Sequence, residues 1–165
     1  MGERQVILSL DLATSTGWAA SVPASPSGRP KSGVWRLGTD ALSLGSFFDG
    51  FDQLLSDAIT VFAPRLIVYE APILHSGQMT PATALKLQGL AALTELIAFR
   101  REVPVRQANN QTVKKFFAGY GHAKKPDMIA ACRDRGWNID SPDEADALAI
   151  LAWAQAGFPK GGKAA

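Results

Sequence analysis

Close to its C-terminus the chain reads Ser141-Pro142-Asp143-Glu144-Ala145-Asp146-Ala147-Leu148-Ala149-Ile150. Ser141 predicts a helix N-cap, Pro142 the first helical residue, and Glu144 the return half of a capping box. Asp143 and Asp146 are three residues apart, so they project from one side of that helix. Acids early in a helix often only complement its dipole. The helix dipole explains Asp143 and Glu144 but not Asp146. Asp146 lies between alanines and needs a partner, such as a hard cation.

Two short apolar runs elsewhere in the chain each lead into an acid. Val6-Ile7-Leu8-Ser9-Leu10 is followed by Asp11, and Leu66-Ile67-Val68-Tyr69 is followed by Glu70. Runs of this kind are typical of buried central strands. Either acid alone is more often a solvated strand end, but two core strands that each deliver a carboxylate point to a site.

The order of the remaining segments predicts an α/β fold: one mixed five-stranded sheet with helices on both faces. We expect residues 1–157 to form one domain and residues 158–165 a flexible basic tail. The expected strands are 6–10, 16–22, 33–37, 66–69 and 104–108, and the expected helices are 44–62, 81–101, 110–117, 125–135 and one from 142 onward.

The segment 81–101 is apolar almost all round, which predicts a helix covered on two sides. One side suits the chain's own sheet. The other side suits a second subunit, and full burial within its own chain is the competing explanation.

Composition indicates an ordinary soluble protein, with 47% hydrophobic and 19% charged residues. No uninterrupted apolar run approaches the roughly 20 residues of a membrane span, so no membrane association is expected. Cys132 is the single cysteine, which favours a cytoplasmic setting. The net charge is only +2, but basic residues gather between Arg100 and Lys125, where Glu102 is the one acid. That distribution suits a polyanion such as nucleic acid.

In the expected sheet, the four acids converge at one edge: Asp11, Glu70, Asp143 and Asp146. Carboxylates gathered in this way do not stay ionised together without cations. The set suits two Mg²⁺ ions about 4 Å apart, which would support in-line displacement at a phosphodiester. Mn²⁺ is an expected substitute. The chain has no Cys/His cluster for zinc, and no small-molecule cofactor is expected.

The sequence resembles the RuvC-type Holliday-junction resolvases of the RNase H-like superfamily over nearly its whole length. The resemblance is carried by Asp11 with Thr16-Gly17, Glu70, Ala84-Leu85-Lys86-Leu87, Gln111-Thr112-Val113-Lys114 and Asp143-Glu144-Ala145-Asp146-Ala147-Leu148-Ala149. It implies that the four acids bind the metals. It also implies a structure-selective DNA endonuclease that resolves four-way junctions by paired cuts, as a homodimer joined through the helix 81–101.

The resemblance further implies DNA-contacting roles for particular side chains. Lys114 and Lys125 match residues that contact DNA or assist near the scissile phosphate. Each has a lysine neighbour, Lys115 and Lys124, so the acting member of each pair stays open. Ile73 or Leu74 takes the place of the junction-probing side chain, and we also expect His75 and Lys86 to contact DNA.

Other functions remain as alternatives. Asp11-Leu12-Ala13-Thr14-Ser15-Thr16-Gly17 also resembles the first phosphate motif of actin-like ATPases and sugar kinases, but 165 residues do not hold two such lobes. A related nuclease acting on flaps, other branched DNA or RNA–DNA hybrids is a second alternative. A non-catalytic junction-binding module is a third, and the presence of all four acids argues against it.

Overall fold

The computed structural model describes residues 5–23, 28–38, 43–70, 72–73 and 79–160. Its sheet has the order β3-β2-β1-β4-β5. The first three strands pair antiparallel, and β1, β4 and β5 run parallel. This is the mixed five-stranded sheet that the sequence predicts. The strands are β1 Ile7–Asp11, β2 Ser15–Pro23, β3 Pro30–Arg36, β4 Leu66–Glu70 and β5 Val105–Ala108.

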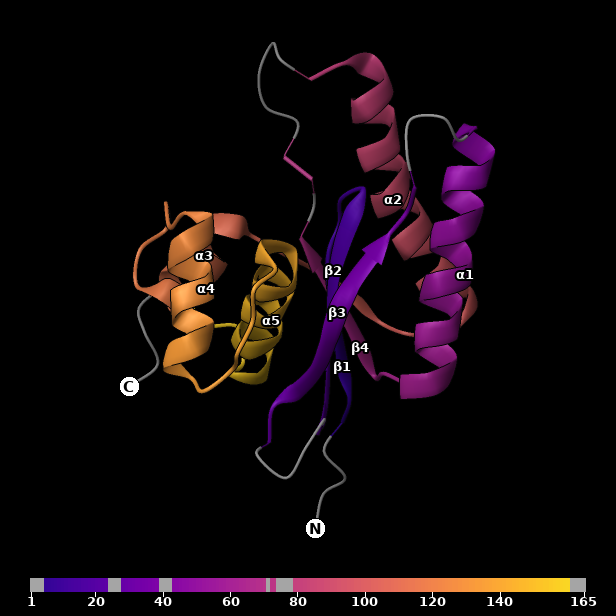
Figure 1. Cartoon of the computed structure of the whole chain (residues 1–165). Helices are drawn as coiled ribbons and strands as arrows, with labels where there is room; N and C mark the ends of the chain where they lie inside the picture. Colours follow the sequence, from indigo (N-terminus) through magenta and orange to yellow (C-terminus); the bar gives the residue numbers. More distant parts are fainter. Residues whose placement is uncertain (1–4, 24–27, 39–42, 71, 74–78, 161–165) are drawn as a thin grey trace.

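Helices cover both faces of the sheet, as predicted (Figure 1). One face carries α1 (Leu44–Phe62) and α2 (Pro81–Arg100), while the other carries α3 (Asn110–Ala118), α4 (Lys125–Asp134) and α5 (Pro142–Gln155). Alternation along the strands builds a separate core on each face. Leu8, Leu10 and Tyr69 pack with α1 and α2, whereas Val68 packs with the α5 side.

The helix α5 lies close against β1 and β2 because small residues line the contact. The buried Ser9 hydroxyl of β1 donates to the Ala147 carbonyl oxygen of α5 at 2.7 Å and to the Ala19 carbonyl oxygen of β2 at 3.2 Å. A Cβ atom on Gly17 of β2 would overlap the backbone carbonyl of Asp143. The first turn of α5 is therefore fixed to the strands that lead to and from Asp11.

The predicted capping of α5 is half right. The Ser141 hydroxyl accepts a hydrogen bond from the Glu144 amide, as expected for an N-cap. The Glu144 carboxylate, however, accepts from the Ser32 hydroxyl at 2.7 Å and from the Arg29 guanidinium at 3.2 Å. The predicted return half of the capping box is thus wrong, because partners on and beside β3 bind this carboxylate and tie the β2–β3 hairpin to α5.

The helix α2 is covered on one side only within the chain. Leu90, Ile97 and Ala98 are buried against the sheet and α1, whereas Leu96 and Phe99 are 42% and 81% exposed. Burial by its own chain is therefore wrong as an explanation of its apolarity. Within the described residues, α2 is also long and apolar enough by length and composition to cross a membrane, although Lys86 and Glu95 interrupt its apolar run. Length and composition alone do not separate a membrane span from an interface helix.

The first two residues of the expected tail contact the rest of the chain. The Trp153 indole donates to the Pro159 carbonyl oxygen at 2.9 Å, and the Arg106 guanidinium lies 3.7 Å from the centre of the Phe158 ring. Phe158 and Pro159 thus pack on the rest of the chain, while residues 161–165 lie outside the described residues.

Candidate active site

Asp11 and Glu70 are the last residues of two neighbouring parallel strands. They are direct register partners across β1 and β4. Neighbouring strands are about 4.8 Å apart, so the two acids leave the sheet edge side by side. The sequence prediction of two carboxylates at one edge is matched by this placement.

Asp143 and Asp146 reach the same edge from the first turns of α5. The contacts of Gly17 and Ser9 hold that part of the helix against β1 and β2. All three other acids act electrostatically on Asp11. The structure thus places the other three predicted acids within electrostatic reach of Asp11, although the four come from three separate elements.

Burial and neighbouring negative charges raise the pKa of three of these carboxylates, namely Asp11, Glu70 and Asp146. Burial, followed by the negative charges of Asp146, Glu70 and Asp143, holds the pKa of Asp11 well above its usual range. Burial raises the pKa of Asp146 to about 6, with Asp143 adding to the effect. Burial also raises the pKa of Glu70. An environment of this kind favours a cation that would neutralise the group.

Two lysines oppose this rise in pKa. Their effects on the acids indicate which member of each adjacent lysine pair lies nearer to them. Lys114, half-buried on α3, lowers the pKa of Asp11, Glu70 and Asp146, and Lys125 at the start of α4 lowers that of Asp146. Lys115 is exposed, and Lys124 acts instead on Asp127 beside it. Position therefore favours Lys114 and Lys125 as the lysines of the site.

Asn110 is a member of the site that the sequence reasoning missed. Its side-chain amide donates a hydrogen bond to Oε1 of Glu70. A signal was available: Asn110 follows β5 by two residues, and Ala108, the last residue of β5, is the register partner of Glu70.

The donor set fits hard divalent cations, since it consists of carboxylate oxygens without a thiolate or imidazole. Within the described residues, no three acidic, His or Cys side chains already stand close enough together to hold a metal ion. Binding an ion therefore requires the side chains of the four acids to turn toward one another. A cation bound there would relieve the electrostatic repulsion around Asp11.

The other predicted DNA contacts are only partly placed. Ile73 is 47% exposed and lines a cavity of about 230 Å³ together with Asp11 and Glu70. Lys86 on α2 lies 5.2 Å from the centre of the Phe47 ring of α1. Leu74 and His75 lie outside the described residues.

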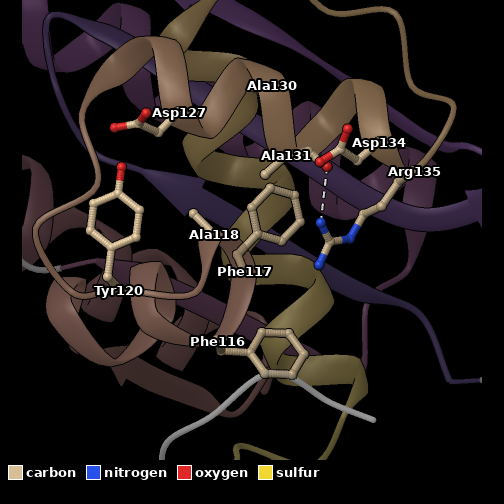
Figure 2. Close-up of a pocket in the computed structure, with 9 residues that line it drawn as sticks. All are labelled: Phe116, Phe117, Ala118, Tyr120, Asp127, Ala130, Ala131, Asp134 and Arg135. Atoms are coloured by element: carbon tan, nitrogen blue, oxygen red, sulfur yellow. Dashed lines mark hydrogen bonds between the residues drawn. The ribbon is translucent and has the colours of Figure 1, made fainter.

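Figure 2 shows a separate pocket of about 410 Å³ between α3 and α4. None of the four acids lines it. The Arg135 guanidinium there stacks 3.8 Å from the centre of the Phe117 ring and donates to the Ala131 carbonyl oxygen at 2.9 Å. These contacts tie the end of α4 to α3, so we assign them a structural role.

The raised pKa of Asp146 predicts a pH-dependent stability for the metal-free protein. Its pKa is about 6 in the fold, against 3.8 for an ordinary aspartate. The folded state therefore takes up a proton before the unfolded chain does, and the free energy of unfolding rises as the pH falls through 6. Between about pH 7.5 and about pH 4.5, this group contributes a gain of about 2 kcal/mol. Urea denaturation in EDTA measures it, and an equal gain in Asp146→Asn would assign the effect to another group.

Similarity to known proteins establishes the family. A crossover junction endodeoxyribonuclease RuvC from Rickettsia conorii is 32% identical over 154 residues, covering 88% of this chain and 93% of the relative. The chain belongs to the RuvC family. The RuvC of Rickettsia bellii, 30% identical over 153 residues with the same coverage, agrees with this assignment. No protein-family model matches the chain.

Solved structures share the fold of this RuvC-family chain. Thermus thermophilus RuvC matches with a TM-score of 0.72 and 20% identity, covering 95% of this chain and 99% of the other. The same protein in complex with a Holliday junction substrate gives a TM-score of 0.73 and 19% identity, covering 96% and 99%. The yeast mitochondrial Holliday junction resolvase Ydc2 gives 0.63 and 17%, covering 88% and 75%. The predicted RNase H-like fold class is thereby confirmed.

Proposed function

We propose that this RuvC-family protein is a crossover-junction endodeoxyribonuclease that resolves four-way DNA junctions by paired, metal-dependent cuts. The observation that carries the proposal is the meeting of Asp11 and Glu70 in one strand register, with Asp143 and Asp146 of α5 beside them. The relatives it resembles bear this activity in their names. Action on cellular DNA places the protein in the cytoplasm of a bacterial or phage-infected cell.

Asp11, Glu70, Asp143 and Asp146 would hold two Mg²⁺ ions, with Mn²⁺ as a substitute. When bound, such ions supply a more acidic water and stabilise negative charge on the departing oxygen. The carboxylates would orient the ions, and one of them would accept the proton of the attacking water. Water attacks phosphorus, the bond to the 3′ oxygen breaks, and that oxygen takes up a proton from solvent, so the products carry a 5′ phosphate and a 3′ hydroxyl.

Lys114 and Lys125 contribute fixed positive charge next to the acids. Both already act on Asp146, so both lie within electrostatic reach of a phosphate bound there. An ammonium group in this position attracts the phosphate and stabilises the charge that builds up on it in the transition state. Lys115, Lys124 and Lys86, with Ile73, Leu74 and His75, would contact the flanking DNA. Contacts to phosphates make binding salt-dependent.

The exposed side of α2 would be covered by a second copy of the chain. Leu85, Leu96 and Phe99 lie along this side, and each is at least 42% exposed. A two-fold symmetric dimer uses the same surface on both copies and presents two identical sites. Two sites on opposite strands explain how one complex makes paired cuts. A membrane is a poorer partner for α2. Glu95 on the helix accepts a hydrogen bond from the Tyr69 hydroxyl of β4 at 2.8 Å, which joins α2 to the sheet through a carboxylate.

We expect Leu96→Asp to dissociate the dimer. A charge placed in an apolar interface weakens association by about 100-fold or more. Sedimentation velocity should then give the 17.6 kDa mass of one chain where the native protein gives twice that mass. The matched control is Ala130→Asp, an exposed alanine on α4 across the sheet, which should stay dimeric. A dimer that survives Leu96→Asp would exclude this side of α2 as the interface.

Labelled substrates test the proposed reaction. Purified protein with Mg²⁺ is offered a four-way junction, a flap, a linear duplex and an RNA–DNA hybrid, each with an EDTA control. Symmetric nicks restricted to the junction support the proposal. Cleavage confined to flaps or hybrid keeps the metal site but changes the substrate. Junction binding without cleavage under Mg²⁺ or Mn²⁺ would favour a binding module.

A further inference from the structure

Asn110 reaches Glu70 because of how β5 ends. Ala108, the last residue of β5, pairs with Glu70, the last residue of the parallel strand β4. The chain then turns at Asn109 and enters α3 with Asn110 as its first residue. The Asn110 side-chain amide donates to Oε1 of Glu70, and the described residues supply no hydrogen bond to Oε2.

The start of α3 is itself held in place. The Asn109 side-chain oxygen accepts from the Thr112 amide at 3.1 Å and from the Thr112 hydroxyl at 3.2 Å. Val113 and Phe117 of α3 are buried in the core. The donor at Asn110 therefore sits on a fixed helix end rather than on a loop.

Asn110 and Lys114 share one face of α3. They are four residues apart, which places them one turn from each other. Lys114 acts on Asp11, Glu70 and Asp146, while Asn110 binds Glu70 directly. This face of α3 is thus directed at the acids, with a cation on one turn and an uncharged donor on the other.

The geometry assigns Asn110 as a positioning residue that holds one oxygen of Glu70 and leaves the other free for a divalent cation. The inference rests on the proposed function, in which Glu70 is a metal ligand. An amide suits this role because it fixes the carboxylate without competing for the metal as an anion or repelling it as a cation. At other metal sites, removing a partner of this kind lowers the metal affinity by about 10- to 100-fold.

Mn²⁺ titration of the full-length protein tests this role without relying on activity. We expect Asn110→Ala to weaken Mn²⁺ binding by about 10- to 100-fold, as measured by calorimetry and by the electron paramagnetic resonance signal of free Mn²⁺. The Mn²⁺ concentration that gives half-maximal cleavage should rise in the same proportion. The affinity for a four-way junction, measured in EDTA, should stay unchanged. Asn110→Gln keeps the amide donor and should recover part of the Mn²⁺ affinity.

Gln111→Ala is the matched control, because Gln111 is the next residue of α3 and is exposed. It should bind Mn²⁺ as the native protein does. Thermal unfolding verifies that each variant is folded. If Asn110→Ala does not fold, the Mn²⁺ affinity of Asn110→Gln tests the role instead. Native Mn²⁺ affinity in a folded Asn110→Ala would overturn the positioning role alone. A native protein that neither binds Mn²⁺ nor cleaves junctions would overturn the proposed function together with it.

Discussion

Replacing Asp11 by Asn should reduce junction cleavage by about 10³-fold or more while leaving junction binding intact. Asp11 is the most centrally placed of the four acids, since the other three all act on it. An asparagine has nearly the same shape but offers the metal a neutral amide in place of a carboxylate. Single-turnover cleavage at saturating Mg²⁺ measures the loss, and a gel-shift titration in EDTA measures binding.

The same variant should be more stable than the native protein in EDTA at neutral pH. Burial and three neighbouring acids raise the pKa of Asp11, so its ionised form destabilises the metal-free fold. Asn110 and Lys114 stay in place, so the rest of the site is unchanged. Loss of cleavage together with loss of stability would instead indicate that Asp11 holds the fold together and would contradict its role as a metal ligand.

Replacing Gly17 by Ala should destabilise the protein by about 2–4 kcal/mol and impair cleavage. The added Cβ would overlap the Asp143 carbonyl, so α5 must move away from β2. Asp143 and Asp146 move with it, and misplacement of reacting groups by about 1 Å typically costs about 10²-fold in rate. Urea denaturation and single-turnover cleavage give the two values.

Gly50→Ala is the control for this substitution. Gly50 lies inside α1, and a Cβ there meets no atom within 4 Å. Alanine in a helix interior is more favourable than glycine by up to about 1 kcal/mol, so stability should rise slightly. Equal losses in Gly17→Ala and Gly50→Ala would contradict the proposed close contact between β2 and α5.

The sequence predicted the sheet and the acids because both rest on local patterns. Short apolar runs that lead into Asp11 and Glu70 predicted two core strands, and these strands proved to be parallel neighbours in direct register. The Ser141 cap and the apolar spacing predicted α5. The connection rules predict the strand order, and that order in turn predicts that these acids converge at one edge of the sheet.

Contacts between segments far apart in the chain were beyond such patterns. Glu144 fits a capping box by spacing, yet Ser32 and Arg29 bind it, more than 110 residues away. The sequence alone does not distinguish Lys114 from its neighbour Lys115. Only the packing of α3 directs Lys114 toward the acids. Asn110 was missed because an asparagine at a helix start usually signals capping, a role that Asn109 takes here.

Cleavage of a supercoiled plasmid bearing an extruded cruciform tests the central claim most directly, because it reads out the metal site and the paired cuts in a single reaction. With Mg²⁺, the native protein should convert the plasmid to linear product within one binding event, cut at symmetric positions flanking the cruciform. Asp11→Asn should leave it supercoiled. Nicked circles as the lasting product, or equal cleavage of a plasmid without the cruciform, would contradict a dimeric junction resolvase.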